Sequence, residues 1–254
     1  MAPDADAVTA EERVALAERL RAIRQRIDAA ASLIGRDVRL LAVSKGQPAS
    51  LVRAAYELGQ RDFGENYVQE LAQKSDALAD LPELRLHLIG HLQRNKVKHV
   101  VEHAVAVHSV DSPALLAELG RRALGHELPA ERRAFGGDGR LPLLVEVSIA
   151  GEAQKSGLPP SELGALLALA ERTDGVRVVG LMCVPPLTED PSASRPYFDA
   201  LARLREEHGG VARLPELSMG MTADFEHAIA AGATLVRVGT AIFGARKPRP
   251  AKDG

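Results

Sequence analysis

The chain has 254 residues, of which 46% are hydrophobic, 26% are charged and 3% are aromatic, and its formal net charge is -2. These are the proportions of a soluble globular protein, and the lack of a basic field and of tryptophan argues against a nucleic-acid or anionic-membrane surface. No stretch has the pattern of a membrane span or a signal peptide, and the single cysteine, Cys183, cannot form an internal disulfide, so we expect a cytoplasmic protein.

The hydrophobic pattern begins with a helix and then alternates between strands and helices. Thr9 and Glu12 have capping-box spacing, and they open a helix predicted over 9–34. Short apolar runs bounded by turn residues predict eight strands, over 38–43, 61–63, 84–89, 104–108, 143–149, 176–181, 214–217 and 234–238. The intervening helices are predicted over 49–58, 65–79, 95–102, 113–124, 160–172, 195–207 and 223–231, and the last strand is followed by a short tail.

This alternation determines the predicted fold class, which is α/β. Strands separated by helices at this spacing indicate right-handed βαβ units and a parallel sheet. Eight units over 38–246 predict a single (β/α)8 TIM barrel, so that residues 1–254 form one domain with an extra N-terminal helix. An open doubly wound sheet is the alternative, but the first strand lacks the G-x-G-x-x-G turn expected there. The polar stretch 125–140 is interpreted as a long loop of this domain.

The first predicted strand leads directly into Lys45. A lysine at the carboxyl end of a buried strand is partly removed from water, which lowers the pKa of its amine and favours attack on a carbonyl group. The alternative is a lysine that extends from the strand end to solvent, and on spacing alone this is the more common case. The rest of the chain must therefore decide between the two interpretations.

Polar residues and glycines gather where the other predicted strands end, which is where a TIM barrel carries its active site. Ser218 and Thr240 offer hydroxyl groups, and Gly220 and Gly239 allow backbone N–H groups to approach an anion. Either glycine turn alone is more often just a tight turn. Together with Lys45 they indicate a phosphorylated carbonyl compound, of which pyridoxal phosphate is the obvious candidate.

Several ordered motifs extend over nearly the whole chain, from about Val38 to Arg246: VSKGQP, FGENYVQE, HLIGHLQRNK, HSVDS, GEAQKSG, GLMCVPP and LSMGMTADFEHAIAAGATLVRVGTAIFGAR. Together they resemble the YggS/PROSC family of pyridoxal phosphate homeostasis proteins. The resemblance implies the barrel of the alanine racemase N-terminal domain, with Lys45 as the Schiff-base lysine and Arg237 against the pyridine nitrogen. It also implies further pyridoxal 5'-phosphate contacts from Asn66 and His87 near the ring, from Ser218, Gly239 and Thr240 around the phosphate, and from the strand-end residues Met182 and Met219.

The expected partner of the pyridine nitrogen bears on function. An arginine is always protonated, so Arg237 can only donate to that nitrogen and keeps it unprotonated. Such a ring is a poor electron sink. Racemases that resemble this barrel take a second base from an additional C-terminal domain, whereas here only eight residues follow Arg246. We therefore expect a monomeric, non-catalytic protein that buffers pyridoxal phosphate for vitamin B6 homeostasis and hands it to pyridoxal-phosphate-dependent apo-enzymes.

Two other functions remain open at this point. One is a pyridoxal-phosphate-dependent amino-acid racemase or lyase, and the other is a barrel enzyme that binds a sugar phosphate through a lysine Schiff base. No metal is expected, because His99 and His103 have helical pair spacing but no evident third ligand. Cys183 follows a buried strand and is interpreted as a core residue.

Overall fold

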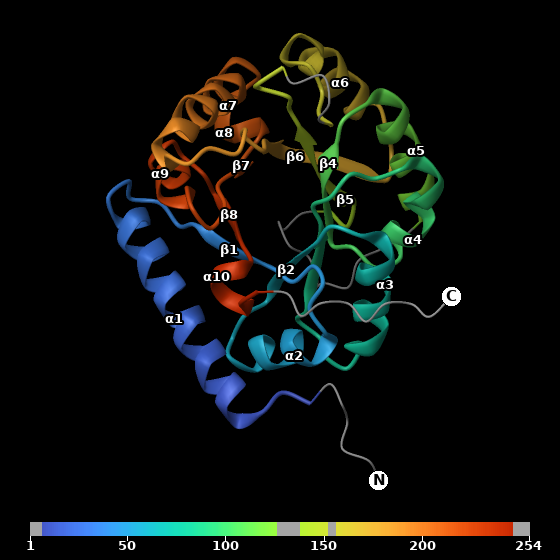
Figure 1. The fold of residues 1–254 in the computed structure, drawn as a ribbon. Coiled ribbons are helices and arrows are strands. Elements are labelled where there is room, and N and C mark those ends of the chain that lie inside the picture. The colour runs from blue at the N-terminus through green and yellow to red at the C-terminus, as the bar shows by residue number, and fades with distance from the viewer. Residues whose placement is uncertain (1–6, 126–137, 152–155, 246–254) are drawn as a thin grey trace.

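The computed structural model describes residues 7–125, 138–151 and 156–245, and its strands form a closed parallel barrel (Figure 1). Each strand pairs with the next one in sequence, and β8 returns to β1. This confirms the predicted (β/α)8 barrel. The strands are β1 (Arg39–Val43), β2 (Asp62–Glu65), β3 (Arg85–Leu88), β4 (Ala106–Val110), β5 (Leu141–Glu146), β6 (Val176–Met182), β7 (Glu216–Ser218) and β8 (Leu235–Val238).

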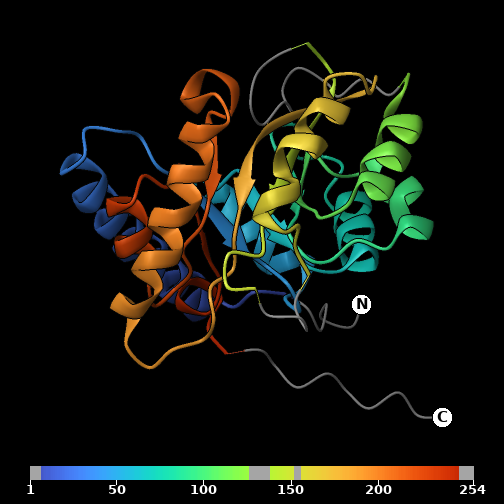
Figure 2. The ribbon, with the colours of Figure 1, turned by 90° about the horizontal axis from the view of Figure 1, so that it is seen from above.

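Helices surround the strands, as both ribbon views show (Figure 1, Figure 2). The α-helices are α1 (Ala10–Ser32), α2 (Ala49–Glu57), α3 (Val68–Ala77), α4 (Val97–Val101), α5 (Pro113–Ala123), α6 (Leu163–Ala170), α7 (Arg195–Glu207), α8 (Gly210–Arg213), α9 (Phe225–Ala230) and α10 (Thr240–Phe243). Short 3-10 helices cover Arg94–Lys96, Pro160–Glu162 and Pro191–Ser194. None of the described helices is both long and apolar enough to cross a membrane. Most of the predicted 125–140 loop lies outside the described residues.

The structure differs from the sequence-based prediction at several strand ends, as in β5, which spans Leu141–Glu146 where 143–149 was predicted, and after β8. Glu65 belongs to β2 and is fully buried, although the prediction placed it at the start of a helix. A glutamate favours a helix by propensity, but here it pairs with Leu88 in the β2–β3 ladder. Strand β4 continues to Val110, two residues beyond the prediction. The expected tail contains α10, whose four residues are too few to show helical periodicity.

The N-terminal helix α1 packs along the outside of the barrel against α2, α9 and α10 (Figure 1). Its predicted capping box is present, because the backbone N–H of Glu12 donates to Thr9 and that of Thr9 donates to the Glu12 carboxylate. One face of the helix is buried, through Leu16, Leu20, Ile23, Ile27 and Ala31. Helix packing of this kind stabilises a helix more than its propensity does. The helix therefore adds to the core of the barrel.

We predict that Leu20→Ala lowers the free energy of unfolding by about 2–5 kcal/mol, because it opens a cavity under α1. Leu20 is 1% exposed, whereas Val14 on the same helix is 59% exposed. Val14→Ala is the matched control and should change stability by less than about 0.5 kcal/mol. Urea unfolding measures both variants. Equal effects of the two substitutions would show that α1 does not pack as described.

Candidate cofactor site at the carboxyl ends of the strands

Lys45 lies in the turn that follows β1, between the buried Ser44 and the exposed Gly46. The lysine itself is partly buried. Gly46 adopts a positive φ of 71°, which closes this turn and which L residues with a Cβ rarely adopt. The turn therefore presents a lysine amine at the carboxyl end of the barrel, as the sequence predicts for a strand-end lysine.

A buried ionic cluster on β2 and α3 holds both neighbours of Lys45. Lys74 donates to the backbone carbonyl of Ser44 (2.7 Å) and to the carboxylate of Glu65 (2.6 Å). The Ser44 hydroxyl also donates to Glu65 (2.6 Å), and the Gly46 N–H donates to Glu70 (2.6 Å). Burial raises the pKa of the Glu65 carboxyl, and Lys74 opposes that rise. The cluster thus fixes the turn on either side of the lysine.

Asn66 follows β2 and offers an acceptor that no described group uses. Its Oδ1 is buried and has no hydrogen-bond partner among the described residues. The end of β3 comes very close to it, because a Cβ on Gly90 would lie 2.2 Å from the Asn66 carbonyl oxygen. A buried polar atom without a protein partner is uncommon and is available to a water, an ion or a ligand. Asn66 is therefore suited to accept a hydrogen bond from a ligand.

Arg237 is the main cation inside the barrel, on β8 beside the strand that carries Lys45. It is 5% exposed and donates to the Ser218 carbonyl (2.5 Å), the Ser218 hydroxyl (2.8 Å) and the Cys183 carbonyl (2.8 Å). Burial lowers the pKa of Arg237, but a guanidinium stays protonated in proteins. The same burial raises the pKa of the Cys183 thiol to about 12, which agrees with its interpretation as a core residue.

The glycine turns after β7 and β8 lie next to each other. The backbone N–H of Arg237 donates to the backbone carbonyl of Gly220 (2.9 Å), and this bond joins the two turns. A Cβ on Gly220 would lie 2.5 Å from the Ala228 side chain, and one on Gly239 would lie 3.1 Å from the Val43 carbonyl. Glycine is therefore required at Gly220, which also has a φ of 90°, while at Gly239 a side chain would be a tight fit against β1. Thr240 follows as an exposed residue and can donate its hydroxyl to a ligand.

The remaining residues that were predicted to contact the cofactor are buried in the barrel. Met182 packs with Leu144 and Val179 in a small separate cluster, whereas Met219 is part of the main hydrophobic core. His87 is fully buried and is linked to Arg237 by hydrogen bonds through His108 and Ser218. The Ser218 hydroxyl thus contacts Arg237 and His108, and its expected contact with the phosphate stays a prediction.

Sequence analysis did not single out several of the supporting residues, namely Asp62, Glu70 and Lys74. Asp62 belongs to a short strand, β2, whose residues are all buried, and a charged residue in such a strand is a usable signal for a buried pair. Lys74 gives no such signal, since a lysine on a helix is normally solvated. Only the tertiary fold shows that it is buried under the Lys45 turn.

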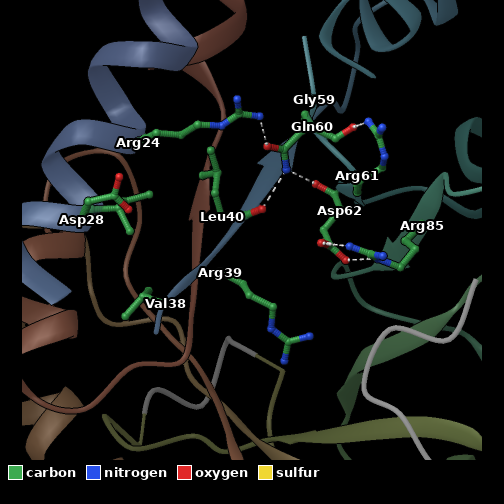
Figure 3. Close-up of a pocket in the computed structure, with 11 residues that line it drawn as sticks. Arg24, Asp28, Val38, Arg39, Leu40, Gly59, Gln60, Arg61, Asp62 and Arg85 are labelled. Atoms are coloured by element: carbon green, nitrogen blue, oxygen red, sulfur yellow. Dashed lines mark hydrogen bonds and ion pairs between the residues drawn. The ribbon is translucent and has the colours of Figure 1, made fainter. Parts of the chain in front are cut away.

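The opposite, amino-terminal end of the barrel contains a cavity of about 270 Å³ (Figure 3). Its arginines already have acceptors. Arg85 pairs with Asp62, Arg61 with Glu83 and Arg39 with Glu216, while Arg24 donates to Leu58 and Gln60. Carboxylates thus balance Arg39, Arg61 and Arg85, and the bonds of Arg24 go to neutral oxygens, so we do not place a phosphate group there. A cluster of metal ligands is also absent from the described residues, and His103 lies 3.9 Å from Asp76.

Comparisons with known proteins agree with this geometry. A family model described as "Alanine racemase, N-terminal domain" matches residues 19–247, and the chain belongs to that family of barrels. It is 41% identical to the "Pyridoxal phosphate homeostasis protein" of Aquifex aeolicus over 91% of this chain and 98% of that one. The protein of the same name from Pseudomonas aeruginosa is 44% identical, over 91% of this chain and 96% of that one.

A solved structure adds a bound cofactor to the comparison. PipY of Synechococcus elongatus, described as having pyridoxal phosphate bound, is 38% identical, with a TM-score of 0.75 over 90% of this chain and all of that one. Within the wider barrel class, the chain thus belongs to the family of pyridoxal phosphate homeostasis proteins.

We predict that Lys74→Met lowers the free energy of unfolding by about 3 kcal/mol, because it leaves the Glu65 carboxylate buried without its cation. Lys98→Met on α4 is the matched control, since Lys98 is exposed, and it should change stability by less than about 0.5 kcal/mol. Urea unfolding at pH 7 compares them. A Lys74→Met protein as stable as the control would contradict the buried pairing.

The buried His108 makes stability depend on pH. Burial holds the pKa of His108 well below its usual range, and His87 and Arg237 add to the effect. The neutral ring therefore stabilises the fold fully above about pH 6.5, and this contribution is lost as the pH falls below that value, because the unfolded ring takes up a proton. We predict that His108→Leu reduces the loss of stability on acidification by about 1.4 kcal/mol per pH unit.

Urea unfolding of both proteins at several pH values between 6.5 and 5 measures this slope. The difference between the proteins reports His108 together with its neighbour His87, 3.0 Å away, whose pKa burial also lowers, while Glu65 and Glu146 are present in both. Leu116→Ala is a control that should lower stability equally at every pH, because Leu116 is a buried, uncharged residue of α5. Parallel pH profiles for wild type and His108→Leu would contradict a buried neutral ring.

Proposed function

We propose that this protein binds pyridoxal 5'-phosphate and holds it in reserve for other proteins, without turning over a substrate of its own. The observation that carries the proposal is Arg237, a buried guanidinium fixed by three acceptors beside the strand that presents Lys45. The names of the relatives, and the bound cofactor described for PipY, support it.

The residues present fit this cofactor. Pyridoxal phosphate supplies an aldehyde that a lysine amine can bind covalently, a pyridine ring that can accept electrons, and a phosphate. In our proposal, Lys45 holds the aldehyde and Arg237 donates to the pyridine nitrogen. The unpartnered Oδ1 of Asn66 accepts from the ring substituents, and the turns at Gly239 and Thr240 hold the phosphate. Ser218 and His87 then act behind Arg237, and Met182 and Met219 shape the apolar floor.

The chemistry of Arg237 favours storage over catalysis. A guanidinium donates but does not accept, so the pyridine nitrogen opposite it carries no proton. A neutral ring withdraws fewer electrons from a bound amino acid than a protonated ring does. The related barrels include alanine racemases, so a racemase or lyase activity is the alternative that the experiment must exclude.

The rest of the proposal concerns how the chain acts. We propose that it acts as one unit in the cytoplasm, as a monomer, and that apo-enzymes which require pyridoxal phosphate receive the cofactor from it. Cys183, the single cysteine, is free and buried, which is compatible with a reducing compartment.

We predict that the purified protein, given pyridoxal phosphate, shows a visible absorption band that borohydride bleaches, and that Lys45→Ala lacks this band. Lys98→Ala, at an exposed position, is the control and should keep it. The same preparations are tested for exchange of the α-proton of L-amino acids in deuterated water. Fast exchange that depends on Lys45 would show that the protein is an enzyme and would overturn the proposed storage function. A wild-type protein that does not bind added pyridoxal phosphate would exclude it as the ligand.

A further inference from the structure

A continuous chain of hydrogen bonds crosses the barrel interior from Arg237 to Asp62. Arg237 donates to the Ser218 hydroxyl (2.8 Å), which lies 3.1 Å from Nδ1 of His108. Nε2 of His108 lies 3.0 Å from Nδ1 of His87, and Nε2 of His87 lies 3.0 Å from a carboxylate oxygen of Asp62. All five side chains are buried. TIM-barrel interiors are mostly filled by branched apolar residues, so this polar chain needs an explanation.

The two ends of the chain set its direction. Arg237 can only donate, so the Ser218 oxygen accepts from it and its one O–H is available for His108. At the other end, burial opposes ionisation of Asp62, but its paired bonds with Arg85 (2.7 Å each) and its bond with His87 hold the pKa of Asp62 well below its usual range. Asp62 therefore can only accept.

The tautomers of both histidines follow from these ends. Because Ser218 donates to Nδ1 of His108, a neutral His108 carries its proton on Nε2 and donates to His87. His87 then carries its proton on Nε2 and donates to Asp62. Burial lowers the pKa of both rings, which keeps them neutral. Every donor along the chain thus points from Arg237 towards Asp62.

This direction matters for the arginine. The Ser218 hydroxyl can turn about its own C–O bond, and a hydrogen bond to His108 keeps its hydrogen away from Arg237 and leaves its lone pairs to accept from the guanidinium. We propose that His108, supported by His87 and Asp62, is a positioning residue that holds the guanidinium of Arg237 in the orientation required to face a bound pyridine nitrogen. This inference rests on the proposed function, in which that nitrogen meets Arg237.

The first test needs no cofactor. Two-bond proton–nitrogen correlation spectra of the imidazoles, recorded on wild-type protein at pH 7, report which nitrogen of each ring is protonated. We expect the Nε2–H tautomer for both His87 and His108, and unchanged tautomers after pyridoxal phosphate is added. A doubly protonated ring, or a proton on Nδ1 of His108, would overturn the inference. The tautomers measured without cofactor test the direction of the hydrogen bonds even if the protein does not bind pyridoxal phosphate.

The second test measures affinity for pyridoxal phosphate in two variants of one residue. His108→Asn keeps an acceptor where Nδ1 stood, whereas His108→Leu keeps none, and both lose the bond to His87. We expect His108→Leu to bind pyridoxal phosphate about tenfold more weakly, with a shifted absorption maximum of the bound cofactor, and His108→Asn to recover most of both properties.

The control is Leu116→Ala on α5. It destabilises the fold but changes none of the residues that form the hydrogen bonds from Arg237 to Asp62. It should leave affinity and absorption maximum unchanged. If His108→Leu also leaves them unchanged, or if Leu116→Ala moves them equally, His108 has no positioning role. If the wild-type protein does not bind pyridoxal phosphate at all, the proposed function fails. The measured tautomers then decide whether the row of hydrogen bonds from Arg237 to Asp62 exists as described.

Discussion

The buried charge of Arg237 is the constraint on which much of this barrel depends. A guanidinium removed from water must give its N–H groups to acceptors, and here these are the carbonyl and hydroxyl of Ser218 and the carbonyl of Cys183. The acceptors come from the ends of two other strands, β6 and β7, so they meet the arginine only when the barrel is closed. Behind Ser218, each buried polar side chain as far as Asp62 likewise has a hydrogen-bond partner. The carboxylate of Asp62 is paired with Arg85.

The turn that carries Lys45 also depends on a buried charge that has its partners, and here the charge lies on the β2 side of β1. Strand β1 pairs with β2, which carries Glu65, and with β8, which carries Arg237. Lys74 is buried under the turn, and it is tolerated there because it has both the Glu65 carboxylate and the Ser44 carbonyl as partners. Two buried ionic networks therefore flank the strand that carries the lysine, and in the first of them Oε1 of Glu65 is paired while Oε2 has no partner among the described residues.

This arrangement explains how a barrel shared with alanine racemases can serve storage. The scaffold places Lys45 and Arg237 on the neighbouring strands β1 and β8, and in the proposed function both hold a phosphorylated aldehyde without acid–base chemistry on a substrate. Fold likeness alone does not separate a racemase from a reservoir. The separation depends on which groups face the pyridine nitrogen and the amino-acid carbon.

The order of elements could be read directly from the sequence. Periodicity, capping residues and turn residues are local signals, so α1 with its capping box, the eight strands and most of the helices were predicted within a few residues. The strand-end position of Lys45 and the grouping of glycines after β7 and β8 follow from the same local order together with the rule for barrel active sites. The ordered motifs then indicated the family.

Only the tertiary structure decided which of these residues meet and which support them. Lys74, Glu70 and Asp62 are ordinary surface-type residues in a sequence, and their burial depends on contacts between elements far apart in the chain. The expected contact of His87 with the cofactor stays a prediction, and the barrel adds what the sequence could not show, a path of hydrogen bonds from His87 through His108 and Ser218 to Arg237, because side-chain direction inside a closed barrel depends on strand tilt and register. The sequence by itself thus determined the elements and their ends, since those depend on local interactions. The polar networks were decided by the closed barrel, since a buried charge is stable only where distant strands bring its partners to it.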